Sequence, residues 1–380
     1  MSNFNNGKTV KRTFWGAAAF YILIAFEFFY MASPFAAYFY AVYQPALNFF
    51  NESPVLAGLV SYFLPHFSQT SSALINLHNV FGAILAFFGF LGFCVGACQV
   101  YYHKLAKKGA VTGGIYNYIR HPQYASFIIC SFGLLLLWPR YIVLIMFITM
   151  LFAYYFLAKV EEKECEAKFG QSYLDYKNKT GMFFPVKFNP TKRLPKPELK
   201  LNKFLLGLGL YLLALAFSFS VALWLNNLTF NNLYAFYTDN SATISVNKIE
   251  SAKLERIINL VYANEEVKAS LNKKITGLEP KFLNYILSGQ WYVPEVPMND
   301  TGTRIRHSSP SNYDRNSYKI IFTQAKIRSN ADAKGIAIIE NIQKREPILE
   351  VWVDLAEGKV VKILDMPAQI VYDQIPVAVY

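Results

Sequence analysis

Two neighbouring stretches of this chain decide its fold: residues 109–124, GAVTGGIYNYIRHPQY, and residues 160–176, VEEKECEAKFGQSYLDY. About 35 mostly apolar residues separate them, enough for two membrane-crossing helices joined by a turn. Because a helical hairpin begins and ends at the same level, the polar residues of both stretches are expected on one side of a membrane. The sequence therefore predicts a polar site where this hairpin begins and ends.

The composition also indicates a membrane protein. Of 380 residues, 54% are hydrophobic and 17% are aromatic, which is too apolar for an ordinary pair of soluble domains. Five apolar stretches approach the ~20 residues that a helix needs to cross a bilayer. They lie at 14–33, 74–101, 123–138, 141–158 and 204–225. We expect an all-α multi-pass membrane domain with about five transmembrane helices, followed by a C-terminal soluble α+β domain.

The segment 34–66 is apolar but is interrupted by prolines. Pro34, Pro45, Pro54 and Pro65 divide it into pieces too short for confident crossings. We interpret it as a re-entrant or interfacial excursion. A single extra crossing here would invert the orientation of everything that follows.

The charge distribution predicts the orientation. Residues 1–235 carry 19 Lys and Arg against 8 Asp and Glu, whereas residues 236–380 carry 18 against 17. Of those 19 cations, 18 lie in four polar stretches, and only Arg140 lies in the turn of the hairpin. The excess of cations on one side places the N-terminus and the loops of the hairpin in the cytoplasm, and with five spans the C-terminal domain is extracytoplasmic. A nucleic acid partner is not expected, because the sequence has no stripe of basic residues interleaved with aromatic residues.

The chain divides into four expected regions. Residues 1–73 form an anchor and the excursion, 74–188 the core membrane module, 189–226 a linker and the last span, and 227–380 the soluble domain. All four cysteines lie in or beside the spans, so no disulfide framework is implied.

Local patterns predict elements in and after the module. Residues 161–179 alternate charged and aromatic residues at helical spacing, which indicates an amphipathic helix folded back over the loop. Residues 247–275 have helical periodicity. Residues 318–328 and 348–364 look like strands, the latter a hairpin that turns at Glu357-Gly358.

The polar residues around the hairpin follow a recognisable order. Gly114, Tyr116 and Arg120-His121-Pro122-Gln123-Tyr124 precede the hairpin, and Glu161-Glu162, Phe169-Gly170, Tyr173 and Tyr176 follow it. This order resembles the signature of the integral-membrane methyltransferases, the isoprenylcysteine carboxyl methyltransferases and the phospholipid N-methyltransferases. The resemblance covers about 80 of the 380 residues. Arg-His-Pro alone would be a weak signal, whereas order, spacing and the intervening hairpin together make it specific.

The resemblance implies S-adenosylmethionine-dependent methylation, with no metal, of a lipophilic acceptor such as a membrane lipid or a lipidated molecule. It also implies a cytoplasmic cofactor pocket. A carboxylate can pair with the amino group of the cofactor, an arginine with its carboxylate, and aromatic faces with its sulfonium. The implied cofactor-binding residues are Gly114, Tyr116, Arg120, His121, Pro122, Tyr124, Glu161 and Glu162, with Arg120 as the candidate catalytic residue.

Two departures from the family pattern bear on activity. Ser126 stands where the family often has glycine, and Lys159 stands where it often has arginine. Serine can preserve close helix packing, but lysine cannot reproduce a bidentate fork. Glu27, inside the first apolar stretch, is a further candidate because charges are costly in lipid.

Two alternatives remain open at this level. Arg120 and His121 could merely anchor a loop at the lipid headgroups, with Glu161-Glu162 opening a solvated helix. The protein could also be a non-catalytic, methyltransferase-like membrane subunit whose external domain binds a partner complex. The long excursion and the C-terminal domain motivate that second alternative, since both exceed a minimal enzyme of this kind.

Overall fold

The structure is a computed structural model of one chain. It describes residues 15, 22, 37–106, 108–185, 203–300, 313–328, 332–367, 369–372 and 375–380. Two units are present, residues 1–49 and residues 50–380, and helix α2 (Ala37–Glu52) crosses their boundary. The predicted span at 14–33 lies almost entirely outside the described residues, and so does Glu27.

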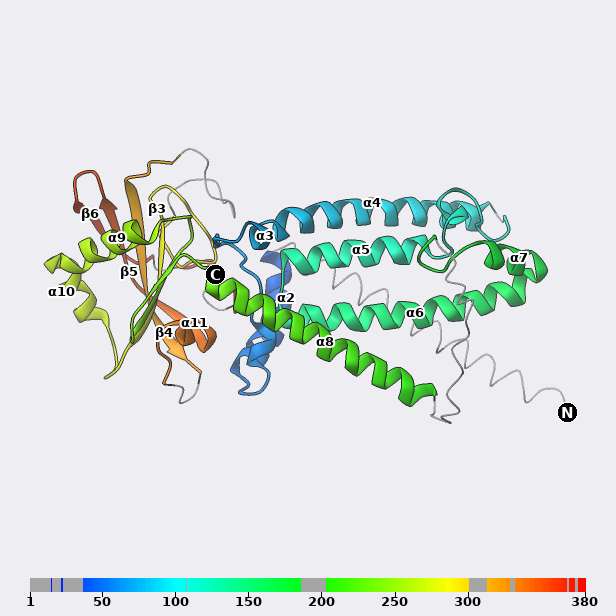
Figure 1. Cartoon of the computed structure of the whole chain (residues 1–380), viewed down its shortest axis with the longest axis horizontal. Helices are drawn as coiled ribbons and strands as arrows, with labels where there is room; N and C mark the ends of the chain where they lie inside the picture. The colour runs from blue at the N-terminus through cyan, green and yellow to red at the C-terminus, as the bar shows by residue number, and fades with distance from the viewer. Residues whose placement is uncertain are drawn as a thin grey trace. The chain divides into compact units, whose positions relative to one another are not determined.

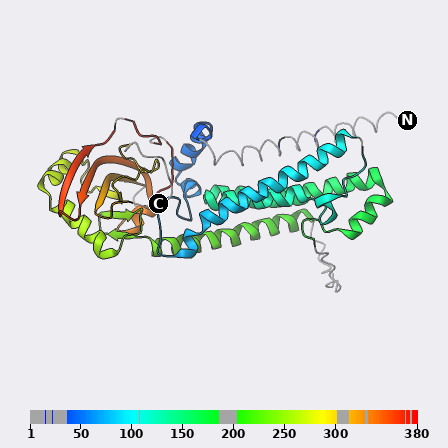
Figure 2. The same cartoon turned by 90° about the horizontal axis from the view of Figure 1, so that it is seen from above.

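Four apolar helices, α4, α5, α6 and α8, lie together among the described residues of the second unit. α4, α5 and α6 run side by side, and α8 packs against α6 (Figures 1 and 2). On that last contact the hydroxyl of Tyr211 lies 2.9 Å from the hydroxyl of Thr149. The bounds are α4 (His78–Leu105), α5 (Pro122–Leu137), α6 (Tyr141–Phe169) and α8 (Lys203–Asn232), with a short α3 (Ala73–Asn76) before α4.

Three of these helices have the length and composition of membrane spans. They cover residues 73–103, 141–169 and 204–232, and they coincide with three of the five apolar stretches that the sequence predicted as spans. The fourth, α5, is apolar but shorter, with 16 residues. The described residues therefore show three candidate spans where the sequence predicted about five.

The helix predicted at 161–179 is wrong in its bounds. α6 continues without a break through Glu161 and Glu162 and ends only at Phe169. Gly170 follows with φ of 55°, a conformation that suits glycine, and turns the chain into α7 (Gln171–Lys179). Only α7 folds back over the loop before α5, as Figure 1 shows at the far end of α6.

Close contact between α4 and α5 depends on glycines. A Cβ atom at Gly89 would lie 2.3 Å from the backbone nitrogen of Cys130, and one at Gly133 would lie 2.3 Å from that of Ala86. Backbone atoms cannot move away from such a Cβ without separating the helices. Small residues thus fix the spacing of this pair, as is common between membrane helices.

The predicted excursion ends in a segment packed on the turn of the hairpin. The 3-10 helix η1 (Ala57–Val60) precedes Tyr62, which pairs with Arg140 in the turn. The backbone nitrogen of Phe63 also donates a 2.9 Å hydrogen bond to the carbonyl of Pro139. Arg140, the single cation that the charge pattern left in this turn, is buried here instead of facing water.

The C-terminal region holds a six-stranded sheet in the order β1-β2-β3-β4-β5-β6. All neighbouring strands are antiparallel except β2 and β3, which are parallel and are connected through α9 (Ser251–Ala263) and α10 (Glu265–Lys274). The strands are β1 (Ala235–Tyr237), β2 (Ser241–Ser245), β3 (Lys281–Ser288), β4 (Ser317–Ile327), β5 (Ile342–Asp354) and β6 (Lys359–Asp365), and a short α11 (Ile336–Glu340) precedes β5.

The sheet buries a hydrophobic core on each face. α9 and α10 supply one core, which contains Ile257 and Val261. The other core gathers α11, the loop after β3, Tyr380 at the end of the same domain, and Phe67 from outside the domain. The hairpin predicted at 348–364 is confirmed as β5 and β6, with Gly358 at φ of 63° in its turn.

Candidate functional site

The loop between α4 and α5 contributes the first residues of the candidate site. Gly114 has φ of 62° and opens the 3-10 helix η2 (Gly114–Asn117). A Cβ atom there would meet only the end of the flexible Gln99 side chain, so it is the left-handed backbone that favours glycine. Tyr116 is buried in η2, and its carbonyl accepts a 2.7 Å hydrogen bond from the hydroxyl of Tyr176 on α7.

The segment after α7 is tied to the same loop through the backbone. The nitrogen of Arg120 donates to the carbonyl of Gly181 at 2.9 Å, and the nitrogen of His121 donates to that of Met182 at 3.1 Å. Pro122 then opens α5, where its missing N–H costs no helical hydrogen bond. The loop is thus held between two helices, with Arg120 and His121 at fixed positions.

Glu162 is the buried centre of a charged cluster. Its side chain is only 3% exposed, and its Oε1 atom accepts a 2.6 Å hydrogen bond from the Nε atom of Arg120. Its Oε2 atom lies 2.9 Å from the Nζ atom of Lys177, which also pairs with Glu166. Two cations therefore compensate this carboxylate, as a buried charge requires.

Arg120 is anchored further by α7. Its Nη1 atom donates to the carbonyl of Lys177 at 3.0 Å and to that of Thr180. The guanidinium therefore joins α6, α7 and the loop. It already has protein partners on two of its nitrogens.

Glu161 has a different environment from its neighbour. Its side chain is 35% exposed, and its Oε1 atom accepts a 2.5 Å hydrogen bond from the hydroxyl of Tyr124. The Nδ1 atom of His121 lies 3.5 Å from Oε2 of Glu161, and the Nε2 atom lies 3.5 Å from Oε1 of Glu162. His121 thus bridges the open carboxylate and the buried one.

Aromatic rings stack next to Glu161. The ring of His121 stacks on Tyr124 with centroids 5.5 Å apart, and Tyr124 stacks on Tyr154 of α6 at 4.8 Å. Phe183 lies against His121 at 5.9 Å. A partly exposed carboxylate beside aromatic rings is suited to a cationic ligand.

Burial and neighbouring charges shift the pKa values of residues in and around the loop. Burial lowers the pKa of His121, but the contacts with Glu161 and Glu162 outweigh burial and leave the pKa above its ordinary value. Burial likewise lowers the pKa of Lys177, and its carboxylate partners raise it by more. Burial raises the pKa of Tyr176 to about 12. The cluster therefore favours a protonated Lys177 and a His121 that readily takes a proton.

The two departures from the family pattern lie on different helices, Ser126 on α5 and Lys159 on α6. Ser126 packs in the α4–α5 contact, where a Cβ atom at Gly92 would lie 2.7 Å from its Oγ atom. Lys159 is exposed, and its ammonium lies 4.5 Å from the ring centre of Tyr155. Neither side chain contacts Glu161 or Glu162 among the hydrogen bonds and ion pairs of the described residues.

The structure brings most of the predicted site residues together. Arg120, His121, Tyr124, Glu161 and Glu162 form one connected cluster. Pro122 begins the helix beside it, whereas Gly114 and Tyr116 contribute through the shape of the loop and the contact with Tyr176.

Lys177 is the residue that the sequence analysis missed. A continuous helix over 161–179 would not have brought it back to Glu162. The turn at Gly170 reverses the chain and does so. The only available signal was Gly170 itself, a glycine at the end of a helical pattern.

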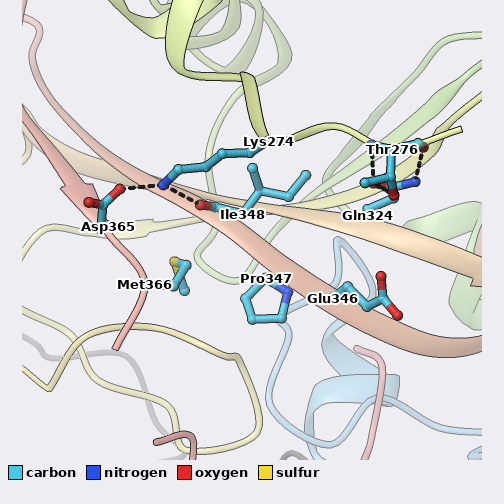
Figure 3. A pocket seen from close by; sticks show the side chains of 8 residues that line it. All are labelled: Lys274, Thr276, Gln324, Glu346, Pro347, Ile348, Asp365 and Met366. Carbon is cyan, nitrogen blue, oxygen red and sulfur yellow. Dashed lines mark hydrogen bonds and ion pairs between the residues drawn. The ribbon is translucent and has the colours of Figure 1, made fainter. Parts of the chain in front are cut away.

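A pocket of about 310 Å³ lies elsewhere, between the end of α10 and strands β4 to β6 (Figure 3). Lys274 donates to the carbonyl of Ile348 at 3.2 Å and pairs with Asp365. Gln324 and Thr276 bond to each other on the other side. Because these polar groups satisfy one another, the cluster at the loop is the stronger candidate for a functional site.

Comparison with known proteins supports the same part of the chain. The model of the phospholipid methyltransferase family matches residues 72–172, a range that contains the loop, the hairpin and both glutamates. No curated protein and no solved structure matches the chain. The family match confirms the resemblance inferred from the motifs.

The matched range ends at residue 172, within the first turn of α7, so Lys177 and the sheet domain lie beyond it. The apolar helices and the matched family together identify a membrane protein with a methyltransferase-type module. Residues 72–172, which carry the loop, the hairpin and both glutamates, are therefore similar to the phospholipid methyltransferase family.

Proposed function

We propose that this protein transfers a methyl group from S-adenosylmethionine to a lipophilic acceptor at the cytoplasmic face of a membrane. The single observation that carries the proposal is the half-exposed carboxylate of Glu161, set beside the stacked rings of His121 and Tyr124 within the matched domain. The acceptor class includes a lipid amine, a prenylcysteine carboxylate or a similar hydrophobic molecule.

The residues present fit the charge of this cofactor, which carries an ammonium and a sulfonium against one carboxylate. The cluster contains three carboxylates, Glu161, Glu162 and Glu166, against the two fixed cations Arg120 and Lys177. One carboxylate is therefore in excess when His121 is neutral. Glu161 is the member of the glutamate pair that is open to a ligand, whereas Glu162 is nearly fully buried.

The chemistry that the cofactor supplies when bound is an activated methyl group on a good leaving group. The protein has then to hold the donor and the acceptor in line, and positioning of this kind can lower a barrier by roughly 7–11 kcal/mol. Glu161 would bind a cationic group of the cofactor, and the rings of His121 and Tyr124 would face it. Arg120 would act through Glu162 and α7, because its guanidinium is bonded to both.

The topology belongs to the same proposal. We place the loop and α7 in the cytoplasm and the sheet domain outside it, with crossings at 14–33 and 123–138 in addition to the three long spans. The support is the excess of Lys and Arg in the stretches next to the loop. A lipophilic acceptor would enter sideways from the bilayer.

A second candidate function is favoured by the sheet domain. Its six strands span residues 235–365, all beyond the matched domain. A methyltransferase-like membrane subunit without catalysis, whose external domain binds a partner complex, would also have this organisation. The two candidates differ in whether the cluster at the loop binds the cofactor.

Titration calorimetry of the purified protein in nanodiscs, with S-adenosylmethionine and with its demethylated product, tests the proposal. We expect wild type to bind the cofactor and Glu161→Gln to weaken binding by on the order of tenfold, the loss of one charge-assisted contact. Glu164→Gln is the matched control, because Glu164 is an exposed glutamate on the same helix. No binding by wild type, or equal binding by both variants, would contradict the proposal.

A further inference from the structure

Lys177 lies beyond the matched domain yet contacts its centre. Its Nζ atom is 2.9 Å from Oε2 of Glu162 and also pairs with Glu166, while its backbone carbonyl accepts from Arg120. Both ends of the residue are therefore used, the ammonium toward α6 and the carbonyl toward the loop. Nothing in the family match assigns a role to this lysine.

This contact differs from an ordinary surface ion pair. The side chain of Lys177 is 33% exposed, but that of Glu162 is 3% exposed. Exposed pairs contribute little because water screens both charges, whereas a buried carboxylate that loses a partner is left uncompensated. Because Glu162 is buried, loss of Lys177 would leave its carboxylate with less compensating charge.

Resting on the proposed function, we propose that Lys177 is a positioning residue: it neutralises Glu162 and so leaves Glu161 as the member of the glutamate pair that the site presents to the cofactor. With Lys177 in place, Oε1 of Glu162 serves Arg120 and Oε2 serves Lys177. His121 is then shared between the two glutamates at equal distances of 3.5 Å.

Removal of the ammonium has a defined electrostatic consequence at His121. The groups that face its ring are Glu161 and Glu162 on α6, Tyr124 on α5 and Phe183 after α7, with Arg120 adjacent in the loop. Without Lys177, Glu162 is less neutralised and attracts a proton to His121 more strongly. The protonated imidazole then pairs with Glu161 and competes with the cationic groups of the cofactor.

The experiment compares Lys177→Met, Lys177→Arg and Lys179→Met in nanodiscs. Lys179 is the matched control, since it is an exposed lysine on the same helix. Calorimetry gives the affinity for S-adenosylmethionine. NMR of ¹³C-labelled histidine gives the titration midpoint of His121, assigned by the loss of its signal in His121→Gln.

We expect Lys177→Met to weaken cofactor binding by on the order of tenfold and to move the His121 midpoint to higher pH. Lys177→Arg should restore both values, and Lys179→Met should leave both unchanged. A merely structural role would lower the melting temperature without moving the midpoint of the folded protein. An unchanged affinity and an unchanged midpoint in Lys177→Met would overturn the inference.

The experiments can contradict the proposed function and the role of Lys177 independently of each other. If wild type binds no S-adenosylmethionine, the proposed function falls. The midpoint comparison still decides whether Lys177 controls the charge at His121. If wild type binds and Glu161→Gln weakens binding but Lys177→Met does not, only the role of Lys177 is lost.

Discussion

The guanidinium of Arg140 donates a 2.7 Å hydrogen bond to the carbonyl of Pro376, 236 residues further along the chain. It also donates to the carbonyl of Val60 at 3.0 Å and lies 4.6 Å from the ring centre of Tyr62. The turn of the hairpin, the segment after η1 and the end of the described chain therefore meet at one buried cation. This cation ties the sheet domain to the membrane helices.

Arg140→Met should destabilise the protein by roughly 2–4 kcal/mol, because the buried carbonyl of Val60 and the partly buried carbonyl of Pro376 both lose their donor. Thermal unfolding in detergent measures the loss, and limited proteolysis should release the sheet domain sooner. Arg315→Met is the control, since Arg315 is an exposed arginine in the sheet domain. Equal melting temperatures for the two variants would show that the buried contact does not hold the parts together.

A second prediction concerns the spacing of α4 and α5. Gly89→Ala places a methyl group 2.3 Å from the backbone nitrogen of Cys130, so the helices must separate. The expected cost is roughly 1–3 kcal/mol, seen as a lower melting temperature. Gly209→Ala on α8 is the matched control, because a Cβ atom there would meet nothing within 4 Å.

This prediction is wrong if the Gly89→Ala variant has the same melting temperature as the control variant Gly209→Ala. Such a result would mean that the α4–α5 contact relaxes without cost. Activity should fall together with stability in Gly89→Ala, because the loop that carries His121 begins at the end of α4 and ends at the start of α5.

A third prediction follows from Lys319, which is fully buried near the start of β4. Within the described residues its Nζ atom has no hydrogen-bond partner, and it lies 5.3 Å from the ring centre of Trp352. Burial, partly offset by Glu350 and Asp300, lowers its pKa to about 8. Between that pH and the ordinary lysine value, the unfolded chain binds more protons than the folded one.

Stability should therefore rise with pH from about 8 to about 10.5, by up to about 3 kcal/mol from this residue. Urea unfolding followed by tryptophan fluorescence measures the slope, and Lys319→Met should remove this part of it. Lys362→Met is the matched control, because Lys362 is exposed and lies over the same Trp352 ring at 5.2 Å. Identical slopes in both variants would count against a buried, partly neutral lysine.

The sequence predicted the elements whose patterns are local. β5 and β6 alternate apolar and polar residues about a glycine turn, and the long apolar runs became α4, α6 and α8. The parallel pair β2 and β3 was missed for a physical reason. β2 has only five residues, and its polar residues Ser241, Thr243 and Ser245 are buried together with Ala242 and Ile244, so its hydropathy did not indicate a buried strand.

The site was predictable in its members but not in its division of roles. Order and spacing brought Arg120, His121 and the two glutamates into one hypothesis. They could not tell which glutamate would be buried, because that depends on where α7 returns after Gly170. The lysine on α7 and the carbonyl partners of Arg120 depend on the same turn.

The last prediction is the pH dependence of the loop. The contacts with Glu161 and Glu162 raise the pKa of His121 above its ordinary value of 6.5 despite burial. As the pH rises, the unfolded chain loses the proton of His121 near pH 6.5, whereas the folded protein keeps it to a higher pH. The stabilisation is fully present below pH 6.5 and is lost as the pH rises through the folded-state pKa.

Thermal unfolding of His121→Gln against wild type isolates this contribution. The difference in stability should be largest at low pH and should shrink as His121 loses its proton. His103→Gln is the control, because the described residues show no carboxylate partner for His103 in their ion pairs. A constant difference across pH would mean that His121 stabilises the loop by packing on Tyr124 alone. In that case the two glutamates would not share its charge.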